Sequence, residues 1–253
     1  MIHILTVHYV DKWIDIQLEN LSKYIKEPFR VYTVLGENYE KHKDKFYYVE
    51  EGRDKHYNSL QKLHKVLDDE NPNENDIIIV LDSDAFPIKS LDDYLEDKLK
   101  DYEFLAINAP EHNYEPLPIQ PFECFYAFRY NFFSKYEFWF KFEPGIHSNW
   151  IDWMIDWFKN KSIEWYPLNR SSPLINLHPL YFGIYDDIIY HNWTGSRNPI
   201  TRPDRKRIAN TNETVEMAIE KNIEIAKSVF EQIENQLDDF MDYLRGNYEG
   251  ELE

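Results

Sequence analysis

The chain is poor in cysteine, poor in positive charge and free of long apolar runs. Its 253 residues contain one cysteine, Cys124, which excludes an internal disulfide bond and a cysteine-rich zinc site. Lys and Arg total 28 against 46 Asp and Glu, so the formal net charge is −18 at pH 7. Such a negative surface repels nucleic acid and anionic membranes, and we expect neither as a partner. The apolar runs are far below membrane-spanning length, so we expect no transmembrane segment.

The composition indicates a folded protein with a substantial core. Hydrophobic residues make up 43% of the chain and aromatic residues 17%, enough for one large domain or a domain with an extension. The first residues, MIHIL, lack the basic region and apolar run of a signal peptide, and we expect a cytoplasmic protein. An anionic substrate would need local positive charge, from a metal ion or from a few Arg and Lys side chains.

The first hundred residues alternate between strand and helix patterns. Short apolar runs predict strands, and apolar residues spaced by three and four predict helices. The expected strands are 2–8, 29–35, 46–50 and 76–82, and the expected helices are 12–26 and a second one from Asp54. This rhythm is typical of an α/β fold with a mostly parallel central sheet flanked by helices, Rossmann-like in type. In such sheets, ligands bind outside the carboxyl ends of the strands.

The second half of the chain is less regular. We expect strands at 103–109, 122–130, 163–166, 174–182 and 187–193, an aromatic helix within 148–160, and a long amphipathic helix from about Thr211. The long C-terminal helix is typical of an element that packs on the domain or forms a homo-oligomer. Its acidic exposed face opposes attachment to lipid.

The stretch IIIVLDSDAFPI, residues 77–88, places two carboxylates at the end of a buried strand. In Asp82-Ser83-Asp84 the two acidic side chains flank one turn residue, so both can approach one hard divalent cation or its bound phosphates. The simpler interpretation is a strand-to-turn aspartate that bonds to the local backbone. The five apolar residues before the pair and its place at a strand end favour a site.

A βαβ half followed by an apolar strand and Asp-x-Asp resembles the nucleotide-sugar glycosyltransferases of the GT-A fold, over about residues 1–200. The resemblance implies a nucleotide-binding half (1–100) and an acceptor half (101–208), and the long amphipathic helix after them predicts a separate helical extension (209–253). It implies Mn²⁺ or Mg²⁺ bridging the diphosphate of a UDP- or GDP-type sugar donor, and a carbohydrate acceptor. Carried over, Asp84 is a direct metal ligand, Asp82 contacts the metal or the ribose, and Ser83 lies against the nucleotide sugar.

The segment IIYHNWTGSRNP, residues 188–199, resembles the late His-x-x-Gly-x-x-Lys-Pro segment of glycogenin-like enzymes. The match rests on His191, Gly195, Arg197 and Pro199, with one extra residue between His and Gly, Arg in place of Lys, and an inserted Asn. The resemblance implies that His191 is the third metal ligand and that Arg197 clamps the diphosphate, since guanidinium forks suit phosphate. The plainer alternatives are a buried, hydrogen-bonded histidine and a solvated loop arginine.

Two further groups of residues follow from the same resemblance. The end of the first strand, with Thr6, His8 and Tyr9, would lie against the base and ribose of the nucleotide. Arg53 and Asn58, around the start of the next expected helix, would lie near the nucleotide as well. Loop filler is the simpler interpretation of these residues.

An acceptor hydroxyl needs a general base if the reaction inverts the sugar's stereochemistry. Asp152, in the segment HSNWIDWMIDWF, is the first candidate, and Asp187 is the second. A retaining reaction needs no such base. The tryptophans of that segment share one helical stripe, which predicts core packing or, at its edge, stacking on a sugar.

Two other functions fit the acidic motif. An apolar strand followed by Asp-x-Asp also resembles the first motif of haloacid-dehalogenase-type phosphatases, although that motif usually opens the chain and Phe86 stands where Thr or Val is usual. A transferase-like fold that binds a nucleotide or sugar without turnover is the non-enzymatic alternative.

Overall fold

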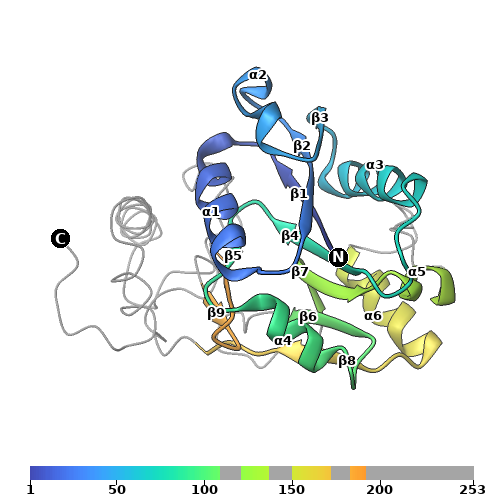
Figure 1. The fold of residues 1–253 in the computed structure, drawn as a ribbon. Helices are drawn as coiled ribbons and strands as arrows, with labels where there is room; N and C mark the ends of the chain where they lie inside the picture. Colours follow the sequence, from blue (N-terminus) through green and yellow to red (C-terminus); the bar gives the residue numbers. More distant parts are fainter. Residues whose placement is uncertain (109–120, 137–149, 172–182, 192–253) are drawn as a thin grey trace, which may run out of the picture.

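The computed structural model describes residues 1–108, 121–136, 150–171 and 183–191, and these are the described residues below. They form a seven-stranded sheet in the order β3-β2-β1-β4-β7-β6-β8 (Figure 1). Its strands are β1 (Ile2–His8), β2 (Phe29–Leu35), β3 (Tyr48–Glu51), β4 (Ile77–Asp82), β6 (Phe104–Asn108), β7 (Pro121–Arg129) and β8 (Trp165–Leu168).

The sheet is mostly parallel, as the sequence predicts. Strands β1, β2, β3 and β4 pair in parallel, and β6 pairs in parallel with β8. Strand β7 is antiparallel to both of its neighbours, β4 and β6. The order β3-β2-β1-β4 is that of a Rossmann-like sheet, in which the strands on the two sides of the β1–β4 boundary are added in opposite directions across the sheet.

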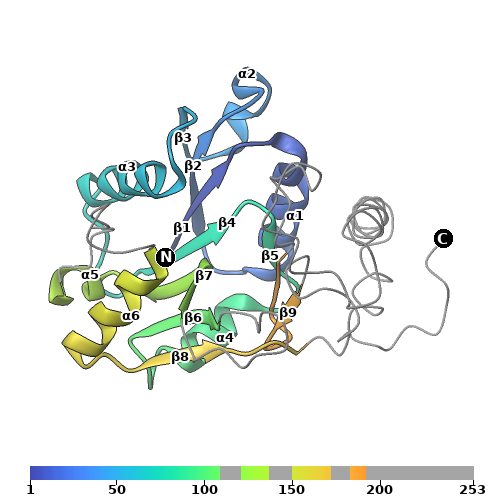
Figure 2. The same ribbon diagram turned by 180° about the vertical axis from the view of Figure 1, so that it is seen from behind.

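Helices cover both faces of this sheet. They are α1 (Ile14–Tyr24), α2 (Tyr39–His42), α3 (His56–Asp69), α4 (Leu91–Lys98), α5 (Asn131–Tyr136) and α6 (Trp150–Lys161), with short 3-10 turns at Asp11–Trp13 and Lys43–Lys45. Helices α1 and α4 pack on one face, and α3, α5 and α6 pack on the other (Figure 2). None of the described helices is both long and apolar enough to span a membrane.

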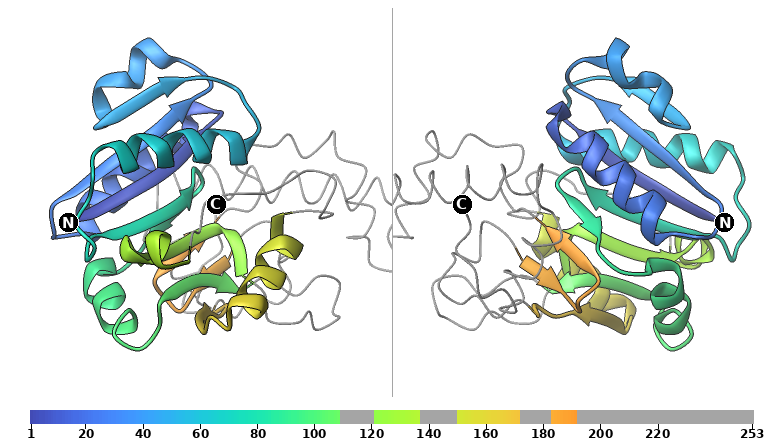
Figure 3. Two further views of the ribbon diagram at one scale, coloured as in Figure 1. Left: turned by 90° about the vertical axis from the view of Figure 1, so that its right-hand side faces the viewer. Right: turned by 60° about the vertical axis from the view of Figure 1, so that its left-hand side comes forward.

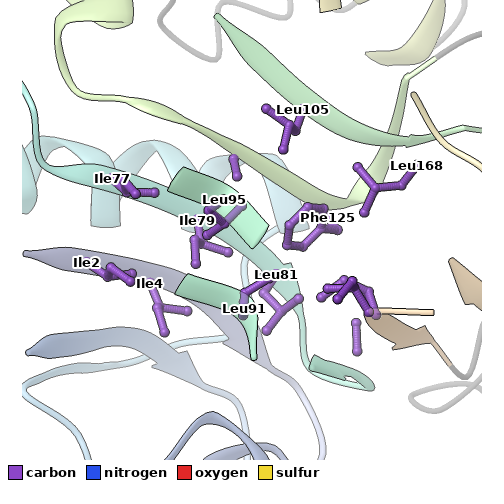
Figure 4. Packing of buried hydrophobic residues seen from close by; sticks show 14 of the residues in the cluster. Ile2, Ile4, Ile77, Ile79, Leu81, Leu91, Leu95, Leu105, Phe125 and Leu168 are labelled. Carbon is purple, nitrogen blue, oxygen red and sulfur yellow. The ribbon is translucent and has the colours of Figure 1, made fainter. Parts of the chain in front are cut away.

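Alternating side chains of the strands divide the core into two layers. On β1, Ile2 and Ile4 belong to the layer under α1 and α4, whereas Leu5 and Val7 belong to the layer under α3. Figure 4 shows Ile2 and Ile4 beside the side chains of β4 and α4 in the first layer. Because successive residues of a strand point to opposite faces, a strand covered on both faces must be apolar throughout. This explains the continuous apolar run before Asp82.

A small second sheet lies beside the carboxyl end of β4 (Figure 3). It has the order β5-β10-β9, with β5 (Ala85–Pro87), β9 (Gly183–Tyr185) and β10 (Ile189–His191), and both pairings are antiparallel. Strand β5 begins three residues after the end of β4, so this sheet holds the segment that follows the two aspartates. The sequence patterns did not predict β5, β9, α2, α4 or α5.

Several expected elements differ from the structure at their ends. Helix α1 spans Ile14–Tyr24 rather than 12–26, because a 3-10 turn precedes it and Ile25 is extended. Strand β8 is Trp165–Leu168 rather than 163–166, and β10 begins at Ile189 rather than at 187 because residues 186–188 form a turn. The expected strand at 174–182, the C-terminal helix and the boundary at residue 208 lie outside the described residues.

Candidate functional site

Asp82 and Asp84 lie at the switch point of the main sheet. Asp82 is the last residue of β4 and is in register with Val7 of β1. It therefore emerges between β1 and β4, the two parallel strands from which the sheet is extended in opposite directions. In Rossmann-like sheets this crevice is where ligands bind. Ser83 and Asp84 form the turn into β5, and Asp84 is 6% exposed.

The small sheet brings His191 to this turn. Strand β10 runs antiparallel to β5, and His191 is in register with Ala85, the residue next to Asp84. The imidazole is buried, at 2% exposure. The chain thus places a histidine from a late segment directly beside two carboxylates from an early one.

The three side chains are spaced as ligands of one metal ion. Nε2 of His191 lies 3.3 Å from Oδ1 of Asp84 and 3.6 Å from Oδ2 of Asp82. One ligand atom from each residue lies within 4.8 Å of the other two, and among the described residues this is the one such group. Ligand atoms at about 2.1 Å from an octahedral ion lie roughly 3 Å from each other, so a small contraction would enclose a cation. Two carboxylates and an imidazole suit a divalent ion such as Mn²⁺.

The carboxylates change the protonation of His191. Burial by itself lowers the pKa of this imidazole, yet the surroundings raise it well above 6.5. The neighbouring Cys124 thiol carries no charge at neutral pH, because burial raises its pKa to about 11. We therefore assign the raised pKa of His191 to Asp84 and Asp82. A metal ion that binds here must displace this proton, because imidazole coordinates in its neutral form.

His56 is a fourth residue at the site, and the sequence analysis missed it. It is the first residue of α3, and its Nε2 lies 3.4 Å from Oδ1 of Asp82, the oxygen that does not face His191. The Asp82 carboxylate thus stands between two imidazoles. The available signal was its position just after a strand that belongs to the same parallel set.

The residues expected at the end of β1 are placed in two environments. Thr6 and His8 are buried inside the sheet, and His8 Nε2 bonds to Oε1 of Gln17 at 3.0 Å. Tyr9 is half-buried beside His56, and its hydroxyl donates to the carbonyl of Asp54. Tyr9 is therefore the member of this group whose side chain adjoins the cluster.

The remaining nucleotide-side residues lie around the same edge. Arg53 is exposed and donates to the carbonyl of Gly36 at 2.7 Å, and it pairs with Glu37. Asn58 is half-buried on α3, two residues after His56, and Ser83 is buried in the turn. The expected phosphate clamp, Arg197, lies outside the described residues.

Among the described contacts, none brings Asp187 to the cluster of two aspartates and a histidine, and the side chain of Asp152 lies outside what the structure describes. Asp187 lies in the turn between β9 and β10, at the end of the hairpin opposite His191, with Lys89 Nζ 3.7 Å away. Asp152 lies in the first turn of α6, which packs on the α3 side of the sheet. On that helix Trp153 and Trp157 pack against the core, which confirms the core interpretation of the tryptophan stripe for these two residues.

The described residues thus define a mixed α/β protein with a Rossmann-like, mostly parallel sheet and a cluster of two aspartates and a histidine at its switch point. No protein-family model and no curated protein sequence matches the chain. Similar solved structures include S. aureus TarS 1-349, at 16% identity and a TM-score of 0.39 over 59% of this chain. This chain spans 52% of that TarS structure, about half its length.

Two other solved structures show a comparable degree of similarity. The nucleoside-diphosphate-sugar pyrophosphorylase from Vibrio cholerae RC9 has 11% identity and a TM-score of 0.43, covering 67% of this chain and 93% of that one. A197 from STIV has 11% identity and a TM-score of 0.40, covering 80% of this chain and 98% of that one. These scores are too low to carry an argument about function, which therefore rests on the site.

Proposed function

We propose that this protein is a metal-dependent glycosyltransferase that moves a sugar from a nucleotide-diphosphate sugar to an acceptor hydroxyl. The observation that carries the proposal is the meeting of Asp82, Asp84 and His191 at the switch point of the sheet. A UDP- or GDP-type donor and a carbohydrate acceptor are the proposed substrates. The resemblance of the Asp-x-Asp strand to GT-A enzymes supports the same choice.

The three side chains would together hold a metal ion beside the diphosphate of the donor. Asp84 and His191 are buried and would hold a divalent ion, Mn²⁺ or Mg²⁺, with Asp82 as the more exposed third ligand. Such an ion, when bound, neutralises the diphosphate leaving group as the glycosidic bond breaks. The site supplies this positive charge in a protein of net charge −18 that otherwise repels a diphosphate.

The remaining roles are also proposals. The nucleotide would be surrounded by Tyr9, Asn58 and Arg53, and by the more buried Thr6, His8 and Ser83. Arg197 would contact its phosphates. Asp152 remains the first candidate for the base of an inverting reaction and Asp187 the second. His56 joins this set, since its imidazole lies beside the outer oxygen of Asp82.

The decisive experiment is a screen of UDP- and GDP-sugars for hydrolysis in the presence and absence of Mn²⁺. We expect Mn²⁺-dependent release of the nucleoside diphosphate by the wild-type protein and its loss in Asp84→Asn, which keeps the shape of the side chain but removes its charge. The matched control is Asp69→Asn, an exposed aspartate at the far end of α3, which should leave turnover unchanged.

The two alternatives give other results. A phosphatase would hydrolyse phosphate monoesters with Mg²⁺ and leave sugar nucleotides intact. A binding protein would be stabilised against heating by a sugar nucleotide with Mn²⁺ but would release no product. Either result would overturn the proposed transferase activity.

A further inference from the structure

We propose that Gln17 is a positioning residue that fixes the turn of Asp82, Ser83 and Asp84 and thereby sets the affinity of the site for a divalent metal. The inference rests on the proposed metal site and deepens it. Gln17 lies on α1, and the hydrogen bonds of its amide join His8 and backbone carbonyls of the turn. It acts through the backbone of the segment that carries two of the three metal ligands.

The amide of Gln17 contacts three carbonyl groups of this segment. Its Nε2 lies 2.8 Å from the carbonyl oxygen of Asp82, 3.3 Å from that of Ser83 and 2.8 Å from that of Ala85. The orientation of the amide is settled by these partners, because its oxygen would be repelled by three carbonyl oxygens. The side chain is fully buried, at 0% exposure, so water does not compete for these bonds.

His8 holds the other end of the amide. Its Nε2 lies 3.0 Å from Oε1 of Gln17, and since that oxygen only accepts, the proton of His8 must be on Nε2. Burial lowers the pKa of His8 to about 4, so the imidazole is neutral and this tautomer persists at neutral pH. A buried chain of hydrogen bonds thus runs from His8 at the end of β1, through Gln17 on α1, to the turn after β4.

The buried carbonyl groups of the turn require a hydrogen-bond donor, and the Gln17 amide supplies it. The carbonyl groups of Asp82, Ser83 and Ala85 converge on one buried point, and unpaired buried carbonyls are rare in folded proteins. Without the amide, the turn would reorient its peptides toward other donors. Because the peptide planes of the turn direct the Asp82 and Asp84 side chains, reorientation would separate the carboxylates from His191.

The experiment measures Mn²⁺ affinity directly, by titrating the free Mn²⁺ signal in electron paramagnetic resonance with no substrate present. Gln17→Met keeps the length and burial of the side chain but cannot donate. We expect its dissociation constant for Mn²⁺ to rise about 10–100-fold, the usual effect of removing a partner that orients metal ligands. Gln17→Glu, nearly identical in shape, should weaken binding as well because it places an acceptor against the carbonyls.

Asn20→Met is the matched control. Asn20 is also a buried amide on α1, but it donates to the carbonyl of Ile16 within its own helix. Losing it should lower thermal stability while leaving the Mn²⁺ dissociation constant within about twofold of the wild type, since no metal-ligand partner is lost. If the role of Gln17 were purely structural, Gln17→Met and Asn20→Met would have the same effect on the Mn²⁺ dissociation constant.

The outcomes separate this inference from the proposed function. Equal Mn²⁺ affinity in wild-type protein and Gln17→Glu, or equal weakening in Asn20→Met, would overturn the role of Gln17 while leaving the metal site intact. Absence of Mn²⁺ binding in the wild type would overturn the site and the inference together. If Gln17→Met does not fold, the near-isosteric Gln17→Glu still decides the question.

Discussion

Asp186 is a carboxylate that joins three separate parts of the chain. One of its oxygens accepts hydrogen bonds from the hydroxyl of Tyr94 on α4 at 2.8 Å and from that of Tyr166 on β8 at 2.9 Å. The other accepts from the backbone N–H of Asn169 at 2.8 Å. Burial and the nearby Asp186 raise the pKa of Tyr94, so its hydroxyl stays protonated and donates at any moderate pH. These bonds fasten the turn of the β9–β10 hairpin, which carries His191 at its far end.

We therefore predict that Tyr94→Phe destabilises the protein without changing its fold. Removing a hydrogen bond to a charged group costs about 1.5–3 kcal/mol of unfolding free energy, and Tyr94 is half-buried. Urea denaturation measures this directly. Tyr102→Phe is the control, because Tyr102 meets Tyr166 through its ring and should change stability by less than about 0.5 kcal/mol. Equal losses in the two variants would contradict a specific role for the Asp186 bond.

The residues of the candidate site differ in how far the sequence reveals them. Asp82 and Asp84 could be predicted because a strand buried on both faces ends abruptly in charge. His191 could be predicted only through a resemblance to a known segment. Gln17 and His56 were not predicted, because each is an ordinary polar residue of a helix whose partners are far away in sequence. The position of His56 after a parallel strand does not by itself point to Asp82. Only the packing of α1 and α3 on the sheet brings them to the turn.

At the level of elements, periodicity predicts what is long and buried. Strands β1 and β2 have the predicted bounds, because their apolar runs end at polar residues or at glycine. Strands β5 and β9 have three residues each, too few to show a period. Helix α4 begins at Leu91 in a run rich in acidic residues, and its two core leucines, Leu91 and Leu95, give one helical repeat. Short elements are stabilised mainly by contacts with their neighbours in the fold, so the local sequence pattern is not sufficient to predict them.

Helix α3 carries a buried histidine within its apolar stripe. His64 lies among Leu60, Leu63 and Leu67, and its ring meets that of Phe133 on α5 with centroids 3.9 Å apart. Burial lowers the pKa of His64 from 6.5 to about 4. The unfolded chain therefore takes up this proton at a higher pH than the folded protein. Stability must fall as the pH decreases from about 6.5 toward 4, because protonation favours the unfolded state over that range.

We predict that His64→Leu removes part of this acid sensitivity. At pH 5 the proton costs the wild type roughly 2 kcal/mol through this one residue, from 1.36 kcal/mol per pKa unit. Unfolding free energies measured in urea at pH 7.5 and pH 5 should thus differ less in the variant, by about that amount. Comparing each protein with itself cancels the effect of the changed packing against Phe133. An unchanged difference between the two pH values would show that His64 takes up its proton in the folded state.

At the scale of the whole molecule, the excess of acidic residues opposes the compact state. The described residues do form ion pairs, such as Arg129 with Glu96 and Lys62 with Glu50, but 46 acidic residues face only 28 basic ones. Most of the unpaired negative charges must therefore repel one another across the surface. Exposed ion pairs contribute little each, so their loss in salt is the smaller effect.

Salt should therefore stabilise this protein. Raising NaCl from about 10 mM to about 150 mM shortens the screening length from roughly 30 Å to 8 Å, which suppresses long-range repulsion more than contacts between neighbours. We predict a higher melting temperature, by roughly 2–4 °C for each kcal/mol of repulsion removed. KCl should act equally, because screening depends on ionic strength alone. A lower melting temperature in NaCl would mean that ion pairs outweigh the repulsion.

The same titration separates screening from binding at the Asp82–Asp84–His191 cluster. At constant ionic strength, Mn²⁺ should raise the melting temperature further in the wild type, since a ligand at a hundred times its dissociation constant adds about 2.7 kcal/mol. Asp84→Asn should keep the whole response to NaCl and lose this additional response to Mn²⁺. If the variant retained both, Mn²⁺ would be acting as a general counterion on the acidic surface, and the cluster would have no special affinity. If it lost both, the effect of NaCl would be local to the cluster, because removing one charge of the surplus cannot abolish repulsion spread over the molecule.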